Sequence, residues 1–79
     1  MPDFDVYETT RLLISRLHSD GYAEDAANLR SAMENGATGG EIFMALRPHV
    51  ADIVRRVPLP ADWLIRASRL LAEIDWALR

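Results

Sequence analysis

Residues 38–57, TGGEIFMALRPHVADIVRRV, carry the strongest fold signal in the chain. Thr38 and Glu41 have the spacing of a capping box, in which each side chain hydrogen-bonds the other residue's backbone amide at a helix start. A single apolar face follows, made of Ile42, Phe43, Leu46, Val50, Ile53, Val54 and Val57. Its phase is unchanged across Pro48, so we predict one helix, bent at the proline, rather than two.

Two helical segments precede this stretch. The first, residues 5–20, has an apolar stripe of Val6, Thr10, Leu13, Ile14 and Leu17. We expect Asp3 or Asp5 to cap its start and Gly21, in a left-handed conformation, to end it. The second, residues 22–35, presents Tyr22, Ala26, Leu29 and Met33 and stops at Gly36.

A final helix follows the break at residues 57–60, with Pro60 expected at its first helical position. Its inner face is predicted to hold Trp63, Ala67, Leu70, Leu71, Ile74, Ala77 and Leu78. Short connections favour antiparallel neighbours, so the prediction is one all-α domain over residues 1–79, a compact up-and-down four-helix bundle. The alternative keeps three helices around the core and uses a terminal helix to complete a dimer.

Composition limits the classes of protein to consider. The 79 residues include no cysteine, which removes disulfides and thiolate chemistry and favours a cytoplasmic location. All nine basic residues are arginine, as in proteins from GC-rich bacterial genomes. The N-terminus does not read as a signal peptide, and no apolar run is long enough to span a membrane.

Charge is distributed unevenly along the chain. Residues 1–45 carry eight acids and three arginines, whereas residues 46–79 carry six arginines and four acids. An acidic surface attracts a basic protein partner. We therefore predict that a partner contacts the start of the second helix, at Asp20, Tyr22, Glu24, Asp25 and Asn28. An isoelectric point near 5.2 argues against nucleic-acid binding, despite arginines in the last two helices.

We expect no catalytic, cofactor or metal site. His18 and His49 do not have the spacing of paired metal ligands, because a metal site needs three or four convergent groups. The glycine-rich residues 36–40 resemble an anion cradle before a helix. They lack the Gly-Lys-Ser/Thr ending of a phosphate loop, so the capping reading is favoured.

Some apolar residues do not fit the inner faces. Leu12 and Met44 are out of phase on their helices, and a strip on the back of the last helix contains Ile65, Arg69, Ala72 and Trp76. Tryptophan and arginine are enriched at the centres of protein interfaces. The strip therefore either packs within the fold through a twist, forms a dimer or partner contact, or is simply exposed.

The segments GATGGEIFMALRPHV (36–50) and LLAEIDWAL (70–78) resemble small bacterial helical proteins. Size, helix count and acidity also resemble the colicin-type immunity proteins, four-helix bundles whose acidic face blocks a basic nuclease. This resemblance implies a non-enzymatic inhibitor of a cognate toxin, by analogy of fold alone. The alternative function is a homo-oligomeric structural or regulatory module that assembles through the last helix, and a DNA-binding regulator is the third.

Overall fold

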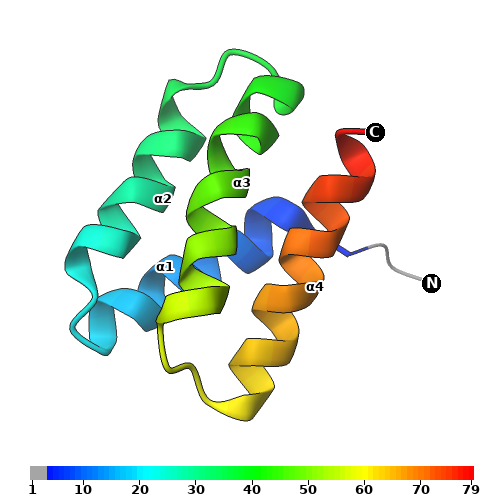
Figure 1. Cartoon of the computed structure of the whole chain (residues 1–79). Coiled ribbons are helices and arrows are strands. Elements are labelled where there is room, and N and C mark those ends of the chain that lie inside the picture. The colour runs from blue at the N-terminus through cyan, green and yellow to red at the C-terminus, as the bar shows by residue number, and fades with distance from the viewer. Residues whose placement is uncertain (1–3) are drawn as a thin grey trace.

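The computed structural model describes residues 4–79, and over that range the chain forms four α-helices joined by short loops (Figure 1). They are α1 (Val6–Ser19), α2 (Ala23–Asn35), α3 (Gly39–Arg56) and α4 (Ala61–Ala77). The prediction of an all-α four-helix bundle is confirmed.

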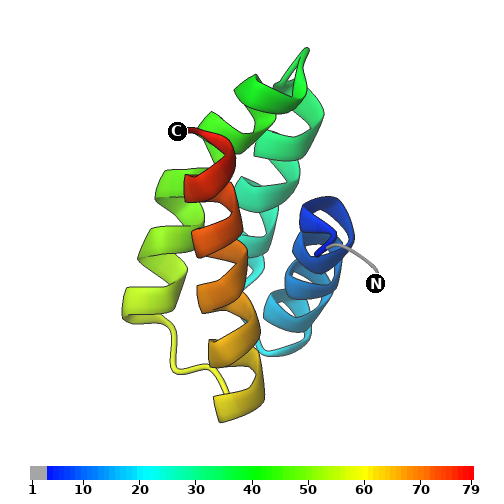
Figure 2. The same cartoon turned by 90° about the vertical axis from the view of Figure 1, so that its right-hand side faces the viewer.

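Each helix packs against its neighbours in the chain, and α1 closes the arrangement by contacting α4. Helices α2, α3 and α4 run side by side in alternating directions, whereas α1 crosses obliquely behind α3 (Figures 1 and 2). Because α4 packs on both α3 and α1 within one chain, the alternative of a three-helix core with a detached terminal helix is wrong.

Local signals place the ends of α1. The Asp5 carboxylate accepts a hydrogen bond of 3.0 Å from the Glu8 amide, so Asp5 is the N-cap; the other candidate, Asp3, lies outside the described residues. At the other end Gly21 has a φ of +90°, and the Tyr22 amide donates to the Leu17 carbonyl at 2.8 Å. This is a glycine-terminated helix end of the Schellman type, as predicted.

The capping box of α3 is confirmed. The Glu41 amide donates to Thr38 Oγ1 at 3.2 Å, and the Thr38 amide donates to Glu41 Oε1 at 3.1 Å. Helix α3 then continues through Pro48 without interruption, so the prediction of a single helix is also confirmed. Pro48 lies on the exposed side, where water can replace the hydrogen bond that proline cannot donate.

Helix α4 begins one residue later than predicted. Pro60 has a ψ of 154° and is the N-cap, with Ala61 as the first helical residue. The Pro60 carbonyl accepts the first helical hydrogen bond, from the Leu64 amide at 2.8 Å. The extended backbone at Pro60 lets the chain turn from α3 into α4 before the helix starts.

The predicted stripes meet in one core. Its most deeply buried members come from every helix: Leu13, Leu17, Leu29, Leu46, Val50, Ile53, Ala67, Leu70 and Ile74. Thr9 and Ala32, which flank the predicted stripes, are also buried. Ala77 is exposed, and its placement on the inner face is wrong, because it lines a surface groove near the end of α4.

Candidate functional site

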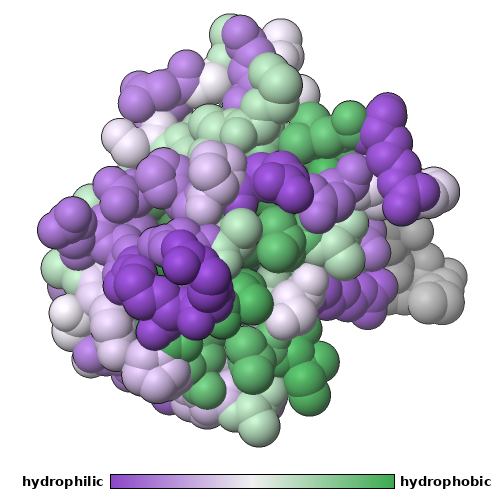
Figure 3. Space-filling view, in the orientation of Figure 1, coloured by the Kyte–Doolittle hydropathy of each residue, from purple (hydrophilic) through white to green (hydrophobic). Residues whose placement is uncertain are grey.

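The outer strip of α4, formed by Ile65, Arg69, Ala72 and Trp76, is exposed along the whole helix. Ile65 is 70% exposed and Trp76 is 67% exposed. The possibility that this strip packs within the fold is therefore wrong. Figure 3 shows hydrophobic side chains gathered over the first half of α4 and along its seam with α3.

A groove of about 420 Å³ lies beside Trp76, between the start of α1, the start of α3 and the end of α4. Four aromatic and apolar side chains face it from these three elements: Phe4, Tyr7, Phe43 and Trp76. The Tyr7 and Phe43 rings form a tilted pair with centroids 5.7 Å apart. Asp5 and Glu73 also line the groove. Because Trp76 belongs to both the groove and the outer strip, the two surfaces are continuous.

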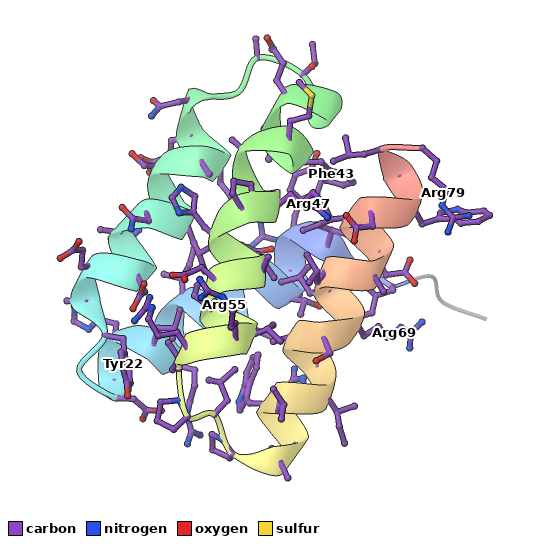
Figure 4. All side chains as sticks on the ribbon, in the orientation of Figure 1. Tyr22, Phe43, Arg47, Arg55, Arg69 and Arg79 are labelled. Atoms are coloured by element: carbon purple, nitrogen blue, oxygen red, sulfur yellow. The ribbon has the colours of Figure 1, made fainter. Side chains whose placement is uncertain are left out.

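Arginine side chains stack on the aromatic rings of this region. The Arg69 guanidinium lies 4.8 Å from the centroid of Phe4, and that of Arg79 lies 4.8 Å from the centroid of Trp76. Figure 4 shows Arg69 and Arg79 projecting from the outward side of α4. These cation–π contacts hold positive charge at the border of the apolar strip.

One further arginine joins α3 to α4 beside the groove. Arg47 donates from Nε to Asp75 Oδ1, and Figure 4 shows its side chain on the α4 side of α3, near Phe43. Both side chains of the pair are about half exposed, so solvent screens the interaction. The pair therefore adds little to the stability of the fold.

The acidic residues predicted to contact a partner are partly engaged within the chain. Asp20 accepts a hydrogen bond from Arg16 at 2.9 Å, and Asp25 accepts one from Arg56 at 2.6 Å. The Asp25 side chain is only 14% exposed. A partner would therefore meet neither carboxylate as a free charge.

The other predicted contact residues lie at the start of α2. Tyr22 is half-buried against the core, beside the turn into α2 (Figure 4). Asn28 is half-buried and Glu24 is exposed. Within residues 4–79, Glu24 forms no salt bridge, whereas Asp20 and Asp25 do. Glu24 is therefore the predicted acid whose charge is most available to a partner.

Arg56 is the centre of a network between α2 and α3. It bonds Asp25 of α2 and also Asp52 of its own helix, from Nη2 to Oδ2 at 2.9 Å, while Arg55 reaches Asp52 at 2.6 Å. The hydrogen bond from Arg56 is the main cause that lowers the pKa of Asp52, and the nearby charges of Arg56 and Arg55 add to it. The pKa of Arg56 is raised by the same carboxylates.

The arginines that a nucleic-acid surface would use have partners inside the chain. Arg47, Arg55 and Arg56 pair with acids. Arg66 stacks over Trp63 at 4.1 Å from the ring centroid, and Arg69 stacks over Phe4. The pairing of Arg47, Arg55 and Arg56 with carboxylates therefore reduces the positive charge that this surface presents to a phosphate backbone.

The loop before α3 binds its own carboxylate. The amides of Ala37 and Thr38 both donate to Glu41 Oε1 at 3.1 Å. Glu41 thus occupies the position that an external anion would take. His18 is exposed at the end of α1 and His49 is half-buried on α3; in residues 4–79 no three side chains of metal-ligand type converge.

A second groove, of about 350 Å³, lies between α1 and α2. Its floor is Ile14 and Met33, and its rim carries both signs of charge, from Arg11, Arg30 and Glu34. Such a mixed rim selects no single class of ligand. The aromatic groove and the outer strip of α4 are therefore the better-defined candidate surface.

The strip is recognisable from the helical pattern of α4, but the groove beside it is not. Phe4 precedes α1, Phe43 lies on α3 and Trp76 lies on α4, and no local pattern links them. Leu64, 41% exposed on α4, also lies outside the predicted strip. The available signal was the clustering of aromatic residues near the starts of α1 and α3 and near the end of α4.

No known protein family, curated protein sequence or solved structure matches this chain. None of the helices in residues 4–79 has both the length and the apolar character needed to cross a membrane.

Proposed function

We propose that the protein acts by non-covalent binding of another protein molecule, without catalysis of its own, and that the outer strip of α4 receives a helix of that partner. The observation that carries this proposal is the exposure of Trp76 and Ile65 on one face of one helix. Burial of the exposed two-thirds of a tryptophan gains roughly 2–4 kcal/mol, so covering this face is favourable.

The shape of the strip supports a helical partner. Ile65 and Trp76 are three turns apart, or about 16 Å along the helix axis. Between them on the exposed face, Ser68 and Ala72 are short, and the longer Arg69 side chain lies over the Phe4 ring at the edge of the strip. A large residue at each end with small residues in the centre forms a shallow saddle, into which the ridge of a second helix fits.

The toxin-neutralising role expected from the sequence is a narrower form of this proposal. It adds that the partner is a basic toxin domain attracted to the acidic first half of the chain, within a bacterial cytoplasm. Exposed Glu24 supports it, whereas the pairing of Asp20 and Asp25 within the chain reduces the acidic surface. The α4 strip is the better-supported contact surface.

Two calorimetric experiments test the proposal. The first titrates the protein with the product of the adjacent gene, and the second dilutes the protein itself to detect dissociation of a self-associated form. We expect one of these two experiments to give heat, and Ile65→Glu with Trp76→Glu to abolish it. Met44→Glu is the matched control, because Met44 is exposed on α3 rather than α4. Heat in neither experiment, or heat unchanged in the double variant, would overturn the proposal.

The same titration at two salt concentrations tests the toxin-neutralising form. Glu24→Arg should weaken binding of a basic partner and reduce its salt dependence. Glu34→Arg makes the same charge change further along α2 and is the control. Equal effects of the two variants would remove a specific role for the start of α2.

A further inference from the structure

We propose that the helix received by α4 is α4 of a second copy, packed antiparallel about a two-fold axis at the level of Leu70 and Leu71. This inference rests on the proposed function and names its partner. It follows from the order of side chains along the strip: Ile65 and Arg69 precede the axis, and Ala72, Glu73 and Trp76 follow it.

The apolar residues match in this arrangement. A two-fold axis between Leu70 and Leu71 brings Ile65 of each copy level with Trp76 of the other, because both lie five to six residues from it. The isoleucine, exposed by 70%, would then pack against the tryptophan, exposed by 67%. The contact occurs twice, as an isologous interface requires.

The charges match in the same register. Arg69 and Glu73 lie one turn apart on the same edge of the strip. Within one copy they form an ion pair without a hydrogen bond, with Arg69 Nε 3.8 Å from Glu73 Oε2, and the Arg69 guanidinium also lies over the Phe4 ring. Antiparallel packing brings Arg69 of each copy to Glu73 of the other. Parallel packing would instead place each side chain level with the same residue of the other copy, so that like charges would be paired.

The centre of the interface allows close approach. Ser68 and Ala72 are small and exposed on either side of the axis, and small residues let helix axes come within about 8–10 Å. A contact of one helix per copy is smaller than the ~800 Å² per partner of a standard interface. We therefore expect a weak dimer, with a Kd on the order of 10–100 μM.

Charge reversal tests this register. In sedimentation equilibrium, Arg69→Glu and Glu73→Arg should each weaken self-association at least about tenfold. Each variant replaces the two symmetry-related pairs of opposite charge by two pairs of like charge. An equimolar mixture of the two variants should associate again, because every cross-interface pair is then of opposite sign. Glu34→Arg, a charge reversal outside the interface, should behave as wild type.

Arg69 is exposed and Glu73 is partly exposed, so circular dichroism should show folded proteins. Trp76→Glu gives an independent loss of association. A wild-type protein that is monomeric at ~200 μM overturns this inference, since a specific interface should associate by then. So does a mixture that associates no better than its components. If that monomeric protein still binds the adjacent-gene product through α4, the proposed function stands and only self-association fails.

Discussion

Replacement of Gly36 by alanine should destabilise the protein, although the backbone there suits any residue. Gly36 has a φ of −83° and a ψ of 135°, so its conformation carries no penalty for a side chain. A Cβ atom, however, would lie 2.4 Å from Ile42 Cγ1, 2.9 Å from the Ile42 nitrogen and 3.1 Å from its Cα. The isoleucine side chain can rotate, but its backbone cannot.

The backbone of Ile42 is fixed by the first turn of α3, where its amide donates to the Thr38 carbonyl at 3.0 Å. The loop must therefore move away from α3, and overpacking of this kind costs about 1–3 kcal/mol. Alanine also lowers the conformational entropy of the unfolded chain, which offsets about 0.4–1 kcal/mol of this cost. A net loss near 1–2 kcal/mol corresponds to a fall in Tm of roughly 4–16 °C for a domain of this size.

Thermal and urea unfolding followed by circular dichroism measure this loss. Gly40→Ala is the matched control, because the nearest atom to its Cβ, Thr38 Oγ1, is 4.0 Å away. Gly40 lies in the first turn of α3, so the control should be neutral or stabilising by up to about 1 kcal/mol. A Gly36→Ala protein that melts at or above the wild-type temperature would refute the steric argument.

Three further predictions concern stability. Leu46→Ala should cost roughly 2–5 kcal/mol because Leu46 is fully buried, whereas Leu64→Ala, at a side chain 41% exposed, should cost less than about 1 kcal/mol; equal losses in urea titrations would contradict the assigned core. Thr38→Ala should cost about 0.5–2 kcal/mol through the lost cap, and an unchanged unfolding midpoint would argue against that cap. Since the pKa of Asp52 is lowered in the folded state, its contribution to stability is present above pH ~4 and is lost as pH falls through the lowered pKa, so stability of Asp52→Asn should vary less over that window. Parallel pH profiles for the variant and wild type would show that the interaction of Asp52 with Arg56 has no effect on stability.

The caps and breaks were predictable because they depend on residues a few positions apart. Thr38 and Glu41 satisfy each other's amides whatever the rest of the chain does, and Gly21 adopts its positive φ at low cost in any context. The start of α4 was misplaced by one residue. The ψ of Pro60 is set by the turn from α3 into α4, which local preference does not fix.

Surface chemistry was less predictable, because it depends on partners from other helices. Asp25 is acidic in the sequence, yet in the fold it meets Arg56, thirty-one residues away, and is largely covered. The acidic surface expected at the start of α2 is therefore smaller than composition suggests. Tyr22 is likewise partly buried against the core.

Four amphipathic helices, their order and most of their inward residues are predictable from local patterns, because helical periodicity and caps involve neighbours within about four positions. The rotation of each helix and its placement against the next are set only when the four helices pack together. That placement brings Phe4, Phe43 and Trp76 to one groove and leaves Ile65 uncovered. Burial and ion pairing between helices depend on packing across the whole core, which local sequence does not encode.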